Sequence, residues 1–270
     1  MTYTTPPRLV ATDLDGTIVR SDGTVSARTV EAFDRARSAG ATIVFVTGRA
    51  PRLVAELAEA FGDQELAICS NGALIYDMRD GKVVEENFIG AEILAEAGRL
   101  LRATIPGIGL AVEYAEGLSA DDLYESDDWD RGVTIRRVGN DELFRHPAPK
   151  LLGRHPSLSA DELLALAAPA LSPIVTPYHS NGLRLVEAIA TGVSKASALR
   201  DLAERLGIDS ADAVAFGDMP NDLPMLSWAG RSYGVANGHA DVLAMVDHVI
   251  PAQDDDGVAE VLEQLFGGRR

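Results

Sequence analysis

The stretch "RLVATDLDGTIV", residues 8–19, places two carboxylates directly after an apolar run. The run itself, residues 9–11, is typical of the end of a buried strand, and Gly16 permits a sharp turn after the acids. Like charges this close together repel each other. Asp13 and Asp15 therefore indicate a site for a positively charged group at the end of a strand, because a simple turn does not need two acids there.

The first third of the chain alternates strand-like and helix-like segments. Apolar, β-branched runs and amphipathic stretches follow one another in the order 8–12, 26–40, 41–47, 50–62 and 66–70. This β-α-β-α-β order predicts a parallel sheet with right-handed crossovers. The same alternation resumes between residues 194 and 266.

The middle of the chain has a different pattern. Residues 76–88 are typical of a hairpin that turns at Asp80-Gly81, and two helical stretches alternate with strand-like ones up to residue 189. Ser159 is a plausible cap for the second of these helices. The sequence therefore predicts a discontinuous α/β core, residues 1–78 and 188–270, with an inserted α+β domain, residues 79–187.

Composition excludes several classes of protein. The 270 residues include 24 Lys and Arg and 41 Asp and Glu, which gives a net charge of −17. This charge disfavours nucleic-acid binding because the protein's field repels phosphates. The N-terminus lacks a signal-peptide pattern, and no apolar stretch reaches membrane-spanning length. We expect a soluble, cytoplasmic protein without a membrane partner, in which the single cysteine, Cys69, is a buried core residue.

Polar residues follow every predicted core strand. After Asp13 and its neighbours come residues 47–49, 70–72 and 217–222. These strand ends meet at one edge of a parallel sheet, which is where such folds bind ligands. Carboxylates, a hydroxyl and amides suit a hard cation and a phosphate, so we expect Mg²⁺. The sequence has one cysteine and no histidine pair at i, i+4, which argues against a site for a soft metal. The segment before Asp13 is a predicted strand, whereas a helix precedes the calcium loop of an EF-hand, so we exclude an EF-hand.

Other phosphate and nucleophile motifs are absent from the sequence. It contains neither G-x-x-x-x-G-K-[ST] nor G-x-G-x-x-G, and no G-x-S-x-G nucleophile elbow. The obvious nucleophile is therefore a carboxylate.

Four motifs in this order, "DLDGT", "VTGR", "GVSK" and "GDMPND", resemble the haloacid dehalogenase (HAD) superfamily of phosphohydrolases. The "SNGA" segment and the large insertion resemble its Cof-type branch, subfamily IIB. The resemblance covers essentially the whole chain. It implies a Rossmann-like parallel-sheet core with an inserted cap of type C2B, and the activity of a magnesium-dependent phosphatase.

The resemblance also implies residue roles. Asp13 attacks phosphorus and becomes an aspartyl phosphate, and Asp15 protonates the leaving oxygen and then activates water. Thr47 binds the transferring phosphoryl group, and Lys195 offsets its charge. The metal ligands are Asp13, Asp15 through its carbonyl, and Asp218, with Asn221 and Asp222 supporting the metal or the phosphate.

Several candidate site residues have two or more possible roles. Thr47 and Gly48 either bind substrate or cap the following helix, and Arg49 either reaches the phosphate, contacts the cap or forms a surface pair. Asn71 either belongs to the site or only makes a turn. Within the cap, residues 176–188 are the candidate specificity segment, since they contain polar side chains near the return to the core; the alternative is an exposed hairpin that turns at Asn181-Gly182. Its candidates are His179, Asn181 and Arg184.

The favoured function is hydrolysis of a small phosphomonoester, such as a sugar phosphate or a phosphorylated cofactor. The partner is thus a small phosphorylated metabolite, and we expect a monomer or a weak homodimer. Alternatives are a phosphosugar mutase or a glycosyl-phosphate phosphatase on the same core, and a non-catalytic metabolite sensor. The presence of both Asp13 and Asp15 argues against the sensor.

Overall fold

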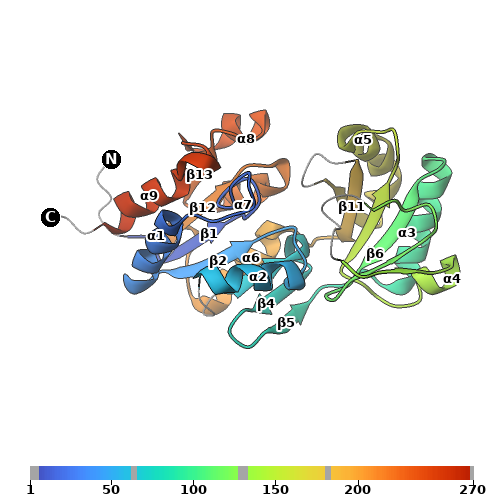
Figure 1. Cartoon of the computed structure of the whole chain (residues 1–270), viewed down its shortest axis with the longest axis horizontal. Helices are drawn as coiled ribbons and strands as arrows, with labels where there is room; N and C mark the ends of the chain where they lie inside the picture. The colour runs from blue at the N-terminus through green and yellow to red at the C-terminus, as the bar shows by residue number, and fades with distance from the viewer. Residues whose placement is uncertain (1–5, 62–65, 127–132, 180–183, 268–270) are drawn as a thin grey trace. The chain divides into compact units, whose positions relative to one another are not determined.

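A computed structural model gives the structure of the chain and describes residues 6–61, 66–126, 133–179 and 184–267. The chain forms two compact units (Figure 1). The first comprises Met1–Arg49, Leu53–Val84 and Ser194–Arg270, and the second comprises Ala50–Arg52 and Glu85–Val193.

The first unit contains an eight-stranded sheet in the order β14-β13-β12-β1-β2-β3-β4-β5. The six strands from β14 to β3 are parallel, and β4 pairs antiparallel with β3. The parallel-sheet core expected from the sequence is therefore confirmed. The strand bounds are β1 Leu9–Thr12, β2 Thr42–Val46, β3 Leu66–Cys69, β4 Leu74–Asp77, β5 Lys82–Glu86, β12 Ala213–Gly217, β13 Arg231–Val235 and β14 His248–Ile250.

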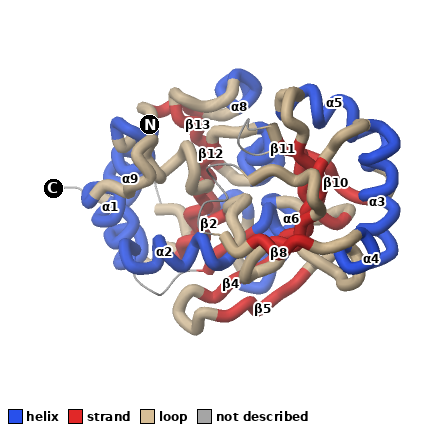
Figure 2. Tube along the Cα trace, turned by 45° about the vertical axis from the view of Figure 1, so that its right-hand side comes forward, coloured by secondary structure: helices blue, strands red, loops and turns tan. Residues whose placement is uncertain are grey.

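Helices lie on both faces of this sheet (Figures 1 and 2). On one face, α6, α7 and α8 pack on alternate side chains of the strands, such as Leu9 and Val44. On the other face, Phe45 contacts Phe33 of α1 and Phe61 of α2. The helix bounds are α1 Ala27–Ser38, α2 Pro51–Phe61, α6 Lys195–Leu206, α7 Leu223–Trp228, α8 Ala240–Met245 and α9 Gly257–Phe266.

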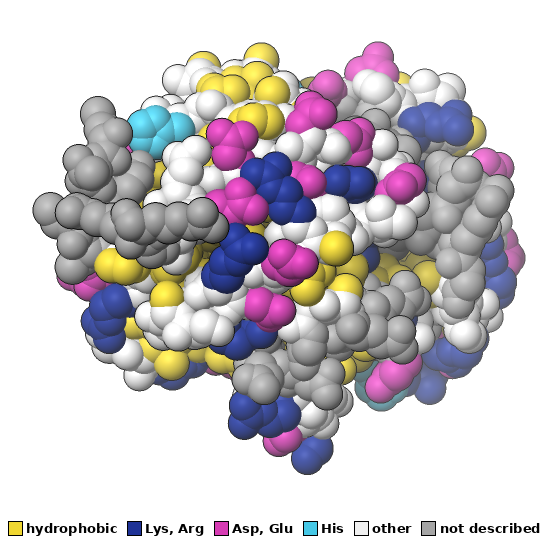
Figure 3. Space-filling model, turned by 60° about the vertical axis from the view of Figure 1, so that its left-hand side comes forward, with side chains coloured by type: hydrophobic (Ala, Val, Ile, Leu, Met, Phe, Trp, Pro, Cys, Tyr) yellow, Lys and Arg dark blue, Asp and Glu magenta, His cyan; other side chains and the backbone are white. Residues whose placement is uncertain are grey.

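The surface of the first unit mixes both signs of charge. On the face in Figure 3, acidic and basic side chains are interspersed with apolar ones. Arg28 of α1, for example, forms an ion pair with Glu263 of α9 at 2.7 Å. Among the described residues, no helix is both long enough and apolar enough to cross a membrane.

The second unit contains a six-stranded sheet in the order β10-β11-β9-β6-β7-β8. Its helices pack on one face through an apolar cluster. Ser159 begins α5 with a reciprocal capping box, as expected from the sequence. The bounds are α3 Ala91–Thr104, β6 Gly109–Glu113, β7 Leu118–Ala120, β8 Ile135–Arg137, α4 Asn140–Leu143, β9 Lys150–Arg154, α5 Ala160–Leu171, β10 Val175–Tyr178 and β11 Leu185–Ala190.

The division into units differs from the expected borders at both ends of the insertion. The hairpin β4–β5 turns where the sequence predicts, but it extends the sheet of the first unit, so residues 79–84 lie there. Strand β11 continues to Ala190 in the sheet of the second unit, so residues 188–193 lie in that unit. The first border thus lies within β5, and the second lies just beyond the end of β11.

Candidate active site

The carboxyl ends of β1 and β12 bring the two acidic motifs together. The Asp13 backbone N–H donates to the Phe216 carbonyl at 3.0 Å, which aligns the two strand ends. Gly16 has φ +80°, and a Cβ there would lie 2.2 Å from Asp218 Oδ2. Only glycine allows this close approach, so the turn after Asp15 requires Gly16.

Lys195 is the first residue of α6, and its side chain is only 2% exposed. Its Nζ donates to Asp13 Oδ1 at 2.6 Å and to Asp222 Oδ1 at 2.7 Å. Burial lowers the pKa of the ammonium, but the charges of Asp13 and Asp222 outweigh burial and raise this pKa above its ordinary value. Lys195 therefore stays charged. The Ser194 capping box fixes the helix start that carries it.

Three buried carboxylates form a cluster, and two of them contact this lysine. Asp13, Asp218 and Asp222 each place one oxygen within 4.8 Å of the others. Burial raises the pKa of Asp13 well above its ordinary value; Lys195 opposes this shift, and the neighbouring carboxylates add to it. Burial and the Asp222 charge raise the pKa of Asp218 to about 7. One ammonium does not balance three carboxylates, so the cluster favours a further cation. Its all-oxygen donors fit Mg²⁺.

The three carboxylates are not equivalent as cation ligands. Asp222 is completely buried, its Oδ1 accepts from Lys195, and its Oδ2 accepts the backbone N–H groups of Asp218 and Met219, both at 3.1 Å. Asp222 therefore orders the loop and orients Lys195. Asp218 accepts one hydrogen bond from the Thr17 hydroxyl at 3.1 Å. Asp13 and Asp218 thus retain more capacity for a cation.

Asp15 lies at the more accessible side of the site, with its side chain 57% exposed. Arg49 binds both of its carboxylate oxygens, through Nε at 2.8 Å and Nη2 at 2.6 Å. A surface pair is one of the three roles expected for Arg49, but the partner found here, Asp15, was not named among them. A bidentate guanidinium fixes both the position and the orientation of a carboxylate.

The segments after β2 and β3 are hydrogen-bonded to each other. Thr47 is completely buried; its hydroxyl oxygen accepts the Arg49 N–H at 3.1 Å, and its carbonyl accepts the Asn71 N–H at 2.9 Å. Asn71 is left-handed, with φ 55°, and its Oδ1 accepts from Asn221 Nδ2 at 2.9 Å. Asn71 therefore both makes the turn and links two of the motifs. Gly48 lies between Thr47 and Arg49 in the same segment.

Some residues at this edge were not singled out from the sequence. Thr17 binds Asp218, and Asn237 donates to the Gly16 carbonyl at 2.7 Å. Asn237 follows β13 as the other polar residues follow their strands, so its position after a strand is a signal that the sequence contains. Ser70 is also left-handed, with φ 48°, and its buried hydroxyl has no hydrogen-bond partner among the described residues.

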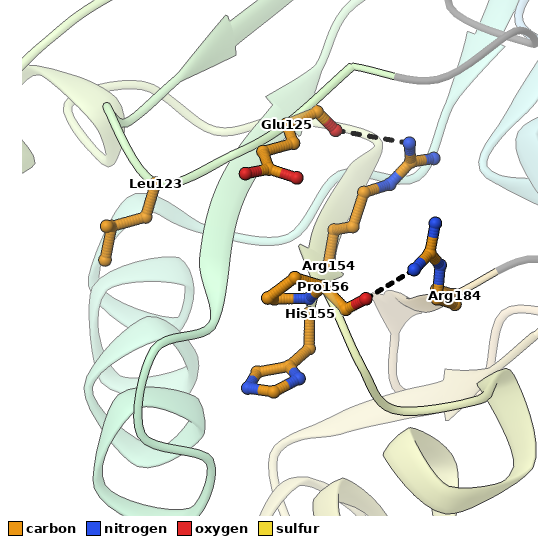
Figure 4. Close-up of a pocket in the computed structure, with 6 residues that line it drawn as sticks. All are labelled: Leu123, Glu125, Arg154, His155, Pro156 and Arg184. Atoms are coloured by element: carbon orange, nitrogen blue, oxygen red, sulfur yellow. Dashed lines mark hydrogen bonds between the residues drawn. The ribbon is translucent and has the colours of Figure 1, made fainter.

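The candidate specificity residues of the second unit have local partners. His179 Nε2 lies 2.9 Å from Asp161 Oδ1. Arg184 donates to the Pro156 carbonyl and lines a small pocket, in which Figure 4 shows its guanidinium near that of Arg154. Asn181 lies outside the described residues. The pocket is lined by Leu123, Glu125, Arg154, His155, Pro156 and Arg184.

Comparison with known proteins identifies the family. Residues 10–262 match the family model of haloacid dehalogenase-like hydrolases. This chain therefore belongs to the haloacid dehalogenase-like hydrolase family, and the resemblance of its motifs to that family is confirmed.

Similar proteins span nearly the whole chain. A 5-amino-6-(5-phospho-D-ribitylamino)uracil phosphatase of Bacillus subtilis, YwtE, is 27% identical over 97% of this chain and 99% of its own. A phosphoglycolate phosphatase of Archaeoglobus fulgidus is 28% identical over 96% of this chain and 97% of its own. Among solved structures, the HAD phosphatase BT1666 of Bacteroides thetaiotaomicron has a TM-score of 0.82 and 26% identity, covering 97% of this chain and 96% of that one.

Proposed function

We propose that this protein is a phosphatase that hydrolyses a small phosphomonoester through an aspartyl-phosphate intermediate. The observation that carries the proposal is the position of Lys195 Nζ, within 2.7 Å of both Asp13 and Asp222 in a buried acidic cluster. A dianionic phosphate cannot approach such carboxylates unless positive charge offsets theirs. Lys195 supplies part of that charge at the attacking group.

In the proposed reaction, an Asp13 carboxylate oxygen attacks phosphorus and the bond to the leaving oxygen breaks. Asp15 gives that oxygen a proton and then takes one from the water that hydrolyses the acyl phosphate. The Arg49 guanidinium positions Asp15 through both carboxylate oxygens, and it would have to release one of them when Asp15 carries the proton that goes to the leaving oxygen. The Thr47 hydroxyl, whose oxygen already accepts from Arg49, has its proton left to donate to the phosphoryl group.

Asp13, Asp218 and the Asp15 carbonyl would hold Mg²⁺, with Asp222 and Asn221 supporting the loop between them. Bound there, the ion would neutralise charge on the transferring phosphoryl group. The fit rests on the donor set, which is all oxygen, and on the pKa values of Asp13 and Asp218, both raised by burial and by neighbouring carboxylates. The second unit is proposed to act as the cap that selects the substrate.

A screen of phosphorylated metabolites tests the proposal. Phosphate release is measured with magnesium, with EDTA, and for the Asp13→Asn variant. We expect release that needs both the metal and Asp13. Release that is unchanged in the variant would contradict the covalent mechanism, and no release from any phosphomonoester would contradict the function.

A further inference from the structure

The loop that follows β13, residues 236–239, contacts both acidic motifs of the first unit. In the parallel sheet β13 pairs with β12, which pairs with β1, so the carboxyl ends of the three strands lie at one edge (Figure 1). The Asn237 side chain donates through Nδ2 to the Gly16 carbonyl at 2.7 Å. The His239 backbone N–H donates to the Asp218 carbonyl, also at 2.7 Å. One short loop therefore holds both segments that carry the acidic motifs.

The turn at Gly16 needs such support because glycine is the least restricted residue of a chain. No other residue fits here, since a Cβ would lie 2.2 Å from Asp218 Oδ2. The backbone N–H groups of residues 17–19 donate to the Leu14 carbonyl and shape the turn. They do not fix the Gly16 carbonyl relative to the neighbouring strands. The hydrogen bond from Asn237 supplies that link.

The Asn237 amide is itself held in one orientation. Its Oδ1 accepts the backbone N–H of Gln253 at 2.9 Å, and its Nδ2 lies 3.3 Å from Gln253 Oε1. Because Oδ1 faces an N–H group, the NH₂ group is the side that faces the Gly16 carbonyl. Next to Gln253, Asp254 accepts the Ser21 N–H at 2.9 Å. The segment after Asp15 is thus joined to residues 253–254 both directly and through Asn237.

We propose that Asn237 is a positioning residue for the magnesium site. This inference rests on the proposed function, in which the Asp15 carbonyl and the Asp218 carboxylate hold the ion. Only the Gly16 Cα separates the Asp15 carbonyl group from the peptide unit that Asn237 holds, so the hydrogen bond limits how that carbonyl can turn. The same loop holds the Asp218 backbone. Mg²⁺ demands near-ideal octahedral geometry, so a fixed spacing of these two segments favours its binding.

The stability of the fold gives a weaker reason for this contact. Asn237 is exposed, so its hydrogen bonds replace hydrogen bonds to water and contribute little to the free energy of unfolding. Variants at this position should therefore fold, and their effect on the metal site can be measured.

Calorimetric titration of magnesium into the protein, without substrate, tests the inference. Asn237→Ala removes the whole amide, and Asn237→Asp keeps the oxygen that accepts from Gln253 but loses the NH₂ group that faces Gly16. Gln264→Ala is the matched control, because Gln264 is an exposed amide of the same unit that donates to Glu260 at 3.3 Å. We expect the Kd of magnesium to rise about threefold or more in both Asn237 variants, the size of one hydrogen bond. It should stay within about twofold in the control.

The Asn237→Asp variant separates position from charge. A new carboxylate beside Gly16 attracts a cation, so charge alone would lower the Kd of magnesium, whereas the lost hydrogen bond raises it. A lower Kd in Asn237→Asp with an unchanged Kd in Asn237→Ala would overturn the inference. Equal Kd values in all the proteins, with unfolding midpoints in EDTA lowered only in the Asn237 variants, would show a structural role and would also overturn it.

Phosphate release separates this inference from the proposed function. At saturating magnesium, the kcat of the Asn237 variants should approach that of the wild type, while the magnesium concentration for half-maximal rate rises with the Kd. Magnesium binding that depends on Asn237 in a protein that releases no phosphate would support the inference and contradict the proposed function. A wild type that binds no magnesium would overturn the inference, even if it released phosphate.

Discussion

Asp13 contacts Lys195 and lies close to two further carboxylates, so its charge is central to the site. Asp13→Asn keeps the side-chain shape but removes the nucleophile. We expect phosphate release to fall below detection, while the circular dichroism spectrum and the unfolding midpoint show a folded protein. An unfolded variant would instead assign Asp13 a structural role, and the exposed Asp34→Asn serves as the control substitution.

Asp15 is expected to act through its side chain in proton transfer and through its backbone carbonyl at the metal. Asp15→Asn should therefore lower kcat by about a hundredfold or more, the usual contribution of general acid–base catalysis. The magnesium concentration that gives half-maximal activity should change little. A large rise in that concentration would mean that the carboxylate itself binds the ion.

The Asp218 carboxyl group makes the stability of the metal-free protein depend on pH. Its pKa is about 7 in the folded chain, because of burial and the Asp222 charge, against about 4 when unfolded. Between these values the folded state holds a proton that the unfolded state releases, so the free energy of unfolding decreases as pH rises through this interval. Urea unfolding from about pH 5 to about pH 8 in EDTA should show this decrease.

Asp218→Asn provides the control for that pH dependence. The variant cannot ionise at this position, so its free energy of unfolding should change less with pH than that of the wild type. Magnesium should stabilise the wild type more at about pH 8 than at about pH 5, because the ion binds the ionised carboxylates. Identical pH profiles for the two proteins would contradict the assignment.

Among the elements, the short 3-10 turn Ser70–Gly72 sets the position of α6. Gly72 has φ +105°, and a Cβ there would lie 2.3 Å from the Ser194 carbonyl oxygen, one residue before Lys195. Gly72→Ala should therefore destabilise the protein by about 2 kcal/mol or more and lower kcat, because the start of α6 must move. Urea unfolding and turnover measure the two effects.

Gly192→Ala is the matched control for this turn. Gly192 also has a positive φ, of +81°, but a Cβ there meets nothing within 4 Å. The Gly192→Ala substitution should lower the free energy of unfolding by the backbone strain alone, about 1 kcal/mol. Turnover should be unchanged. Equal effects of the two substitutions would show that contact with Ser194 does not matter.

Helices and strands with a clear hydrophobic periodicity could be predicted from the sequence. The sheet to which a strand belongs could not always be predicted. The strands that end at Asp13 and Asp218 are continuous apolar runs, and their helices have capped, amphipathic patterns. The hairpin β4–β5 was predicted as a hairpin, yet only its pairing with β3 puts it in the first unit. That pairing has no local sequence signal.

Long-range side-chain contacts were the least predictable part of the site. Lys195 and Asp13 are 182 positions apart, and only the family resemblance linked them. A surface pair was one expectation for Arg49, but its partner Asp15 was not anticipated, because a guanidinium can reach several partners from one backbone position. Lys150 contacts both Glu113 and Glu187 because of the register of β6, β9 and β11, which spacing in the sequence does not reveal.

For the whole molecule, the net charge of −17 should slow the encounter with an anionic substrate. Added salt screens this repulsion, so kcat/KM for a phosphomonoester should rise, by about twofold, between about 10 mM and 150 mM ionic strength at constant free magnesium. A fall over the same range would mean that local positive charge at the site dominates the field.

At the same scale, the segment with His179 and Arg184 is the candidate specificity surface of the second unit. The described contacts of His179 and Arg184 are to Asp161 and Pro156. If this segment selects substrate, Arg184→Ala should change the order of kcat/KM across a panel of phosphomonoesters. An unchanged order would contradict this choice of the specificity segment.

The pairing of β1 with β12 has a consequence for how the protein is made. Leu9 pairs with Ala213, so the central strands of the first sheet cannot join until most of the chain has left the ribosome. Nearly all of the second unit, Glu85–Val193, is one continuous stretch that is synthesised earlier. Domains generally fold as units during synthesis, so the inserted unit is expected to fold first. The acidic site, which needs both Asp13 and Asp218, is then assembled late, and the nascent chain carries no active site while it grows.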